Sequence, residues 1–181
     1  MRSLALLRGI NVGGKNKVDM ATLRETFIRT GAGNVLTYIN SGNVIFDDER
    51  PHHVLASLLE EGIEEGFGLQ VEVLLRDIAS IRRLVAAIPD AWTTDKTMRT
   101  NIIFLWEHVD SPEVVDQLPV RDGVDEIMYF PGAIVWRYDT DKATRSGMGR
   151  LVGTDLYRAM TVRNSNTVRK LAVLMEEQQP G

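Results

Sequence analysis

The first 77 residues contain short apolar runs separated by two segments with helical periodicity. Apolar runs that end at glycine or turn residues predict strands, because they are too short for a helix. Apolar positions at helical spacing predict one helix capped by Asp19 and another after Pro51. The strands are expected at Ser3–Leu7, Val35–Ile39, Val44–Phe46 and Gln70–Leu75. The resulting order, β-α-β-β-α-β, is that of a ferredoxin-like domain.

The remaining residues predict a related arrangement. We expect a helix at 78–88, a strand at 101–106, a short helix from Pro112, a hairpin of 126–130 with 133–138, one helix at 149–160, a short strand at 161–162 and a last helix from about Val168. We therefore predict an α+β protein with two ferredoxin-like halves (βαββαβ, split βαβ) related as a tandem repeat, plus C-terminal helices. The expected domains are 1–77 and 78–181.

Composition narrows the classes of function. The 181 residues are 44% hydrophobic and 25% charged, which is typical of a globular protein. With no cysteine, disulfides, thiolate metal sites and thiol nucleophiles are excluded, and a cytoplasmic location is expected. Because no apolar run approaches the about 18 residues of a membrane span, we expect no membrane partner. The formal net charge of −4 disfavours a general nucleic-acid binder but leaves nucleic acid open. Oligomeric state is not indicated.

A glycine-rich loop follows the first predicted strand. Residues Gly9 to Lys15 have the spacing of a phosphate-binding loop, but Asn16 stands where a magnesium-binding hydroxyl is needed. A nucleotide hydrolase of that type is therefore rejected. The glycines still permit close backbone approach, and the loop is rich in positive charge from Arg8, Lys15 and Lys17. A solvated connection, a phosphate or carboxylate site and a contact with a partner protein all remain open.

Two further polar segments are candidates for ligand contacts. The turn between the first hairpin's strands contains Ser41 and Asn43, which are typical turn residues and could lend donors to a ligand near the glycine loop. Arg163 and Asn164 precede the last helix, where Asn164, Ser165 or Asn166 can act as its cap. An arginine beside a helix N-terminus also suits an anion.

No catalytic set is visible in the sequence. Ser41 has no adjacent base, and the three histidines, His52, His53 and His108, do not have the spacing of a metal site. The glutamates at 60, 61, 64 and 65 are typical of a solvated helix face. Stacking of RNA bases is disfavoured because the first strand lacks aromatic residues. We expect no metal and no cofactor. The sequence leaves open whether the protein is an enzyme, and it favours the answer that it is not.

Three sequence blocks resemble the signatures of a bacterial family called domain of unknown function 1697. The blocks are Leu6–Val18, Thr37–Phe46 and Thr161–Leu171. The resemblance implies an α+β protein with two similar sub-domains and implies no particular activity. It also makes the polar residues of these blocks the natural place for a shared site.

Our first hypothesis is a protein that binds a small anionic ligand, such as a nucleotide or a phosphorylated metabolite. The glycine loop would supply N–H donors and positive charge, and the two other segments would orient the ligand. The alternative is a protein-interaction module, and an enzyme or an RNA-binding protein is less favoured. The candidate ligand-binding residues are Arg8, Asn11, Gly13, Gly14, Lys15, Ser41, Asn43, Arg163 and Asn164.

Overall fold

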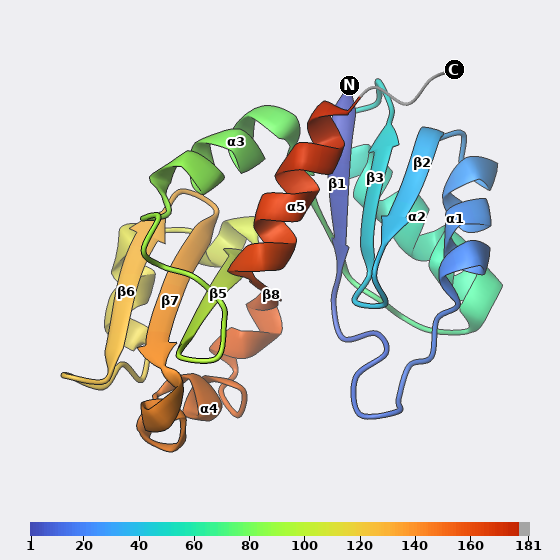
Figure 1. Cartoon of the computed structure of the whole chain (residues 1–181). Helices are drawn as coiled ribbons and strands as arrows, with labels where there is room; N and C mark the ends of the chain where they lie inside the picture. Colours follow the sequence, from blue (N-terminus) through green and yellow to red (C-terminus); the bar gives the residue numbers. More distant parts are fainter. Residues whose placement is uncertain (178–181) are drawn as a thin grey trace. The chain divides into compact units, whose positions relative to one another are not determined.

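The computed structural model describes residues 1–177, and within them the strands form two four-stranded antiparallel sheets (Figure 1). The chain divides into two units, each with one sheet. The first contains Met1–Ile81 and the described residues from Leu171 on, and the second contains Arg82–Lys170. The last helix is thus divided between the units.

The first sheet has the strand order β2-β3-β1-β4. Every neighbouring pair of strands is antiparallel. One helix, α1, lies between β1 and β2 in the sequence, and a second, α2, lies between β3 and β4, as the hydrophobic pattern predicts. The elements are β1 (Arg2–Leu7), α1 (Met20–Arg29), β2 (Gly33–Tyr38), β3 (Asn43–Asp47), α2 (His52–Phe67) and β4 (Val73–Asp77).

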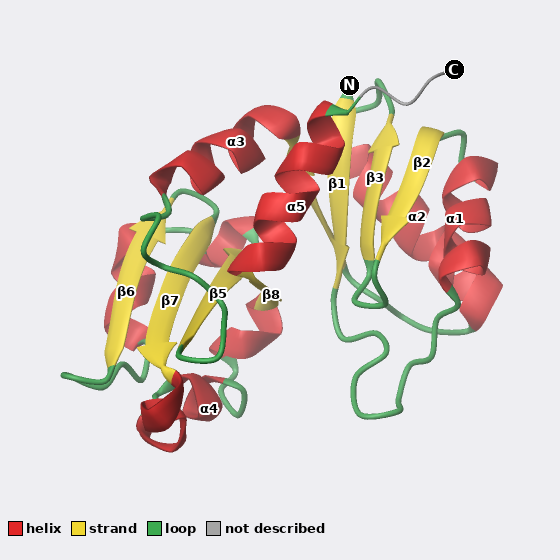
Figure 2. Ribbon diagram, viewed as in Figure 1, coloured by secondary structure: helices red, strands yellow, loops and turns green. Residues whose placement is uncertain are grey.

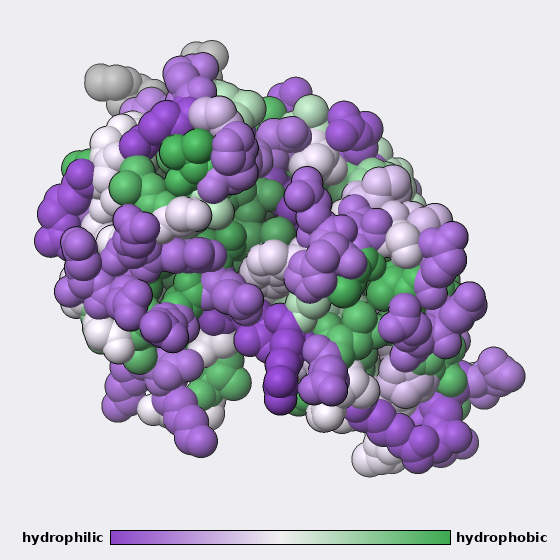
Figure 3. All heavy atoms as spheres, turned by 180° about the vertical axis from the view of Figure 1, so that it is seen from behind, coloured by the Kyte–Doolittle hydropathy of each residue, from purple (hydrophilic) through white to green (hydrophobic). Residues whose placement is uncertain are grey.

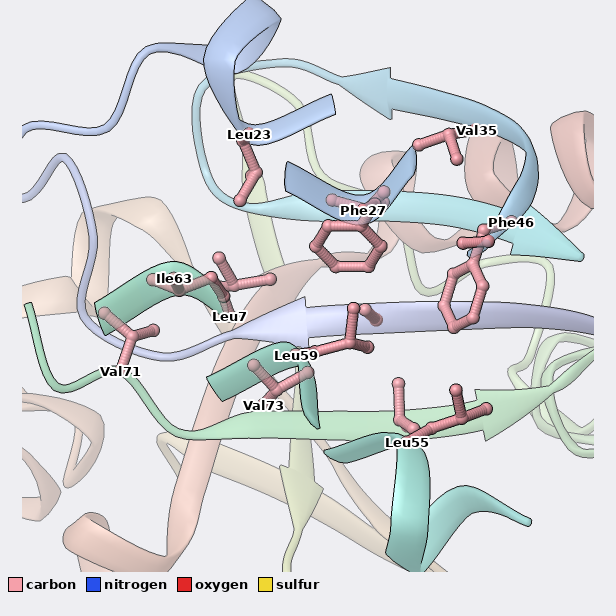
Figure 4. Close-up of a cluster of buried hydrophobic side chains, with 14 of the residues drawn as sticks. Leu7, Leu23, Phe27, Val35, Phe46, Leu55, Leu59, Ile63, Val71 and Val73 are labelled. Carbon is pink, nitrogen blue, oxygen red and sulfur yellow. The ribbon is translucent and has the colours of Figure 1, made fainter. Parts of the chain in front are cut away.

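Helices α1 and α2 bury their apolar faces against one side of this sheet (Figure 4). Phe27 of α1 meets Phe46 of β3 edge to face, with ring centroids 5.4 Å apart. The carboxylate of Asp19 accepts a hydrogen bond from the Thr22 N–H at 2.8 Å, so the predicted cap of α1 is confirmed. These helices are therefore positioned mainly by burial, with a polar cap that sets where the first one begins.

The second sheet has the strand order β6-β7-β5-β8, which is the same relative order as in the first. In the second unit, short helical segments join the strands at the two places where the first unit has α1 and α2 (Figure 2). The strands are β5 (Met98–Leu105), β6 (Asp125–Phe130), β7 (Ala133–Asp139) and β8 (Met160–Asn164). The short segments are η1 (Glu107–Val109), η2 (Pro112–Gln117), η3 (Thr140–Arg145), α4 (Met148–Leu151) and η4 (Leu156–Ala159). Two longer helices, α3 (Ile78–Ala87) and α5 (Ser165–Glu176), each belong partly to both units.

The predicted helix at 149–160 is wrong. The structure has only the four-residue α4 and the 3₁₀ segment η4 there. Glycines at 149 and 153 make a continuous helix costly, by about 1 kcal/mol each relative to alanine in a helix interior. The last helix also begins earlier than predicted, at Ser165, because the Asn164 side chain accepts a hydrogen bond from the Thr167 N–H at 2.8 Å.

Hydrophilic side chains surround smaller groups of apolar ones on the face drawn in Figure 3. Among residues 1–177, no helix combines the length and the apolar character needed to cross a membrane.

Candidate functional site

The glycine-rich loop extends past the end of β1 as a small hairpin of its own (Figure 1). Its tip is the turn from Val12 to Lys15, closed by a 3.0 Å hydrogen bond from the Lys15 N–H to the Val12 carbonyl. Both central residues have positive φ, 58° at Gly13 and 75° at Gly14. Glycine adopts this conformation without the strain that a side chain would add. The loop therefore has a defined backbone shape.

The side chain of Asn11 forms hydrogen bonds that connect the two ends of this loop to each other and the loop to the hairpin turn. Its Oδ1 accepts from the Val18 N–H at 2.9 Å, and its Nδ2 donates to the Val18 carbonyl at 3.0 Å. The same nitrogen donates to the carbonyl of Asn40 at 2.9 Å. Since Asn40 lies in the turn between β2 and β3, the glycine loop and the hairpin turn lie side by side. The sequence anticipated that these two segments could meet.

The hairpin turn is held by its own polar residues. Asn43 is fully buried, and its Nδ2 donates to the Tyr38 carbonyl at 3.1 Å and to Ser41 Oγ at 2.9 Å. Gly42 has a φ of 74°, and a Cβ atom there would lie 2.7 Å from the Cβ of Leu7. Ser41 and Asn43 therefore shape the turn, and the hydroxyl of Ser41 accepts a bond within it.

The positive charge of the loop reaches solvent mainly through its two lysines. Arg8 Nη1 lies 3.7 Å from a carboxylate oxygen of Glu72, so part of its charge is offset. The side chains of Lys15 and Lys17 are exposed and form no ion pair within the described residues. Two exposed apolar side chains lie among these polar groups. Val12 is 66% exposed and Ile39 is 48% exposed, a feature that the sequence analysis did not single out.

Arg163 and Asn164 lie in β8, in the second unit, whereas the other seven candidate residues lie in the first. Arg163 is only 6% exposed, and its Nη1 donates to Thr161 Oγ1 at 3.0 Å and to the Val162 carbonyl at 2.8 Å. Burial lowers the pKa of its guanidinium to about 10, and Tyr157 opposes the shift. Asn164 is the cap of α5. A joint site of these two residues with the glycine loop stays a prediction.

A serine and a histidine that the sequence did not connect are hydrogen-bonded in the first unit. Ser3 Oγ lies 3.0 Å from Nε2 of His52. Ser3 is 0% exposed, so a substrate cannot reach its hydroxyl and the pair is structural. The described residues also contain no group of three or more histidine, aspartate or glutamate side chains arranged to hold a metal ion.

Comparison with known proteins identifies the family. A family model described as "Protein of unknown function (DUF1697)" matches residues 1–136. The chain belongs to the DUF1697 family. The matched residues include the glycine loop and the hairpin turn of this DUF1697 protein, and the block at 161–171 lies outside them.

A solved structure extends the similarity over almost the whole chain. This DUF1697 protein is similar to the conserved bacterial protein SP0830 from Streptococcus pneumoniae, with a TM-score of 0.82 and 28% sequence identity. The alignment covers 97% of this chain and 98% of the other. A comparison with curated proteins found no match. The similarity therefore supports a mixed α+β fold.

Proposed function

We propose that the glycine loop and hairpin turn bind a small anionic ligand, such as a nucleotide or a phosphorylated metabolite. The observation that supports this is the attachment of the loop by Asn11, which presents the Gly13-Gly14 turn in one backbone shape. Within the described residues, the N–H groups of these two glycines donate no hydrogen bond to the protein. They are therefore free to donate to an anion.

Charge at the loop would supply the attraction. Lys15 and Lys17 are exposed beside the glycine turn, and Arg8 adds a charge partly offset by Glu72. Ser41 can donate its hydroxyl hydrogen, whereas the amide hydrogens of Asn11 already have acceptors. In this proposal the side chains of Asn11 and Asn43 fix the conformation of the loop and the turn. The backbone of Gly13 and Gly14 and the charged side chains at 8, 15 and 17 contact the ligand.

A thermal shift measurement tests this proposal. Nucleoside monophosphates, sugar monophosphates and inorganic phosphate would be added to the wild-type protein, to a Lys15→Ala/Lys17→Ala variant and to a Lys96→Ala control, which removes an exposed lysine of the second unit. A ligand at 100 times its Kd stabilises the fold by about 2.7 kcal/mol. We expect a shift in the wild type and the control that is lost in the double variant. A shift retained in the double variant, or none in the wild type, contradicts the proposal.

The second candidate function is a protein-interaction module. The specific observation in its favour is the exposure of Val12 and Ile39 on the two joined segments, because exposed apolar side chains can pack against a partner protein. The variant Val12→Ser/Ile39→Ser distinguishes the two functions. Loss of a partner's binding in this variant, with phosphate-dependent stabilisation absent in the wild type, would favour the interaction module.

We further propose that the two units are ferredoxin-like repeats in a cytoplasmic protein. The shared relative strand order supports the repeat, and the lack of cysteine is compatible with a reducing compartment. Superposition of the four strands of each unit tests the repeat, and poor agreement would contradict it. Cell fractionation tests the location, and recovery outside the cytoplasmic fraction would contradict that part.

A further inference from the structure

The second unit contains a groove of about 880 Å³ beside α4. Its walls come from two segments, the loop before β6 and the stretch from η3 into α4. Arg121 lines one wall, and Arg145 and Arg150 line the other. The volume lies within the range of small-molecule sites, about 300–1,000 Å³. No part of this groove belongs to the glycine loop.

A buried carboxylate joins the two walls. Asp125 Oδ2 accepts from the Arg121 N–H at 2.9 Å and from the Gly147 N–H at 2.8 Å. Asp125 Oδ1 accepts from Ser146 Oγ at 2.5 Å and from Trp136 Nε1 at 3.0 Å. One side chain thus connects both walls to the strand β7 beneath them. The positions of the walls are therefore set before any ligand arrives.

The close approach of the walls depends on a glycine. A Cβ atom at Gly147 would lie 1.7 Å from the carbonyl oxygen of Pro119, which no real side chain can do. The two segments consequently touch through their backbones next in the chain to Val120 and Ser146, which line the groove. This contact and the Asp125 hydrogen bonds make the groove a built feature of the fold.

The arginines of the groove lack the acidic partners that Arg137 and Arg158 of the same unit have. Arg137 contacts Glu126 at 2.8 Å and Asp139 at 2.7 Å, and Arg158 lies 3.7 Å from Asp155. Within the described residues, no carboxylate lies within ion-pair distance of the three groove arginines. Asp122 is the one acidic residue in the lining, so the lining carries an excess of positive charge. Guanidinium groups gathered in this way repel one another unless an anion joins them.

We propose that this groove binds a small molecule with two or more phosphate groups. A guanidinium group can donate two parallel hydrogen bonds to the oxygens of one phosphate. Because the three arginines come from both walls of the groove, they can bind separate phosphates. No aromatic side chain lines the groove, so recognition rests on the phosphates and not on stacking of a base. The site is independent of the proposed function of the glycine loop.

Binding of inorganic triphosphate, measured by calorimetry and thermal shift at low ionic strength, tests the proposal. Arg121→Gln, Arg145→Gln and Arg150→Gln would be made singly and together. All three side chains are exposed, and the Arg121 backbone N–H that bonds Asp125 is kept. We expect each single change to weaken binding by about tenfold and the triple variant to abolish it. Sodium chloride at matched ionic strength should not reproduce the thermal shift.

Two controls separate this groove from other cationic surfaces. Arg158→Gln removes an exposed arginine of the same unit outside the groove, and Lys15→Ala/Lys17→Ala removes the cations of the glycine loop. Arg158→Gln should bind triphosphate as the wild type does, and Lys15→Ala/Lys17→Ala should keep the binding that the groove arginines supply. Unchanged binding in the triple variant, or no binding to the wild type, overturns the proposal. A short RNA that binds more tightly than triphosphate and is lost in the triple variant would overturn the choice of a small molecule.

Discussion

The side-chain nitrogen of Asn11 lies 2.9 Å from the carbonyl oxygen of Asn40, which is 29 residues further along the chain. This hydrogen bond joins the glycine loop to the turn between β2 and β3. Because Asn11 also makes two bonds to Val18, a single side chain controls both the shape of the loop and its position. The stability of the loop can therefore be tested at one residue.

Replacing Asn11 with alanine should lower the free energy of unfolding by about 2 kcal/mol. The change removes three hydrogen bonds and leaves a residue with φ of 54° without the side chain that favours this conformation. Urea unfolding measures the loss. Asn11→Gly is the matched control, because it removes the same bonds but tolerates the positive φ, so it should be less destabilising than Asn11→Ala. Equal stability of the wild type and Asn11→Ala would contradict the role given to this side chain.

Replacing Gly42 with alanine should destabilise the protein more than the same change at Gly68. Both residues have positive φ, 74° and 64°, so both substitutions carry a similar backbone cost of about 1 kcal/mol. Only at Gly42 would the new Cβ meet another side chain, 2.7 Å from the Cβ of Leu7, and nothing lies within 4 Å at Gly68. Urea unfolding of both variants separates the steric cost from the backbone cost, and equal losses would show that the turn can move away from β1.

Asp125→Ala should lower the free energy of unfolding by about 3 kcal/mol. The change leaves buried donors, including the indole N–H of Trp136 and the backbone N–H of Gly147, without their acceptor. Urea unfolding followed by tryptophan fluorescence would report it. Asp122→Ala is the control, because Asp122 is exposed and its loss should change stability by less than about 0.5 kcal/mol. A variant of Asp125 as stable as the control would mean that the walls of the groove do not depend on this carboxylate.

His52 should make the protein less stable as the pH falls below neutrality. Burial is the main cause that lowers the pKa of His52 below its ordinary value of 6.5, and Asp77 opposes the shift while Arg76 adds to it. The unfolded chain therefore takes up a proton at higher pH than the folded protein does. Stability is lost as the pH falls through about 6.5 and levels off below the folded-state pKa.

The variant His52→Gln isolates this contribution. Glutamine does not titrate and can still bond with the hydroxyl of Ser3, which His52 contacts at 3.0 Å. Unfolding free energies of both proteins would be measured between about pH 5 and pH 8. The difference, wild type minus variant, should rise with pH in this range. Parallel curves would show that the two states bind the proton equally.

Local patterns predicted most elements of the first unit correctly. The strands and helices of residues 1–77 follow from runs and periodicities a few residues long, and the Asp19 cap acts three residues away, on Thr22. Prediction failed at 149–160, where glycines interrupt the segment, and just before it the backbone at Gly147 approaches Pro119. Such an approach involves residues far apart in the sequence, so no local pattern indicates it.

The candidate site could be predicted only in part, because contacts between residues far apart in the sequence leave no local pattern. Glycine content and charge correctly drew attention to the loop at 9–17 as a polar segment. However, Asn11 and Asn43 were predicted to contact a ligand. The structure shows that their amides bond to backbone and side-chain groups of the protein itself. The groove arginines were missed because Arg121, Arg145 and Arg150 form no motif, and only the fold places them around one space.

By itself, the sequence determined the type and order of most elements and the polar segments between them, because hydrophobic periodicity and turn chemistry act over a few residues. The tertiary structure alone decided the strand order of each sheet, which polar side chains are occupied by internal hydrogen bonds, and which cations share a surface. Those properties depend on contacts between distant residues, such as Asn11 with Asn40 and Asp125 with Gly147, and packing selects them.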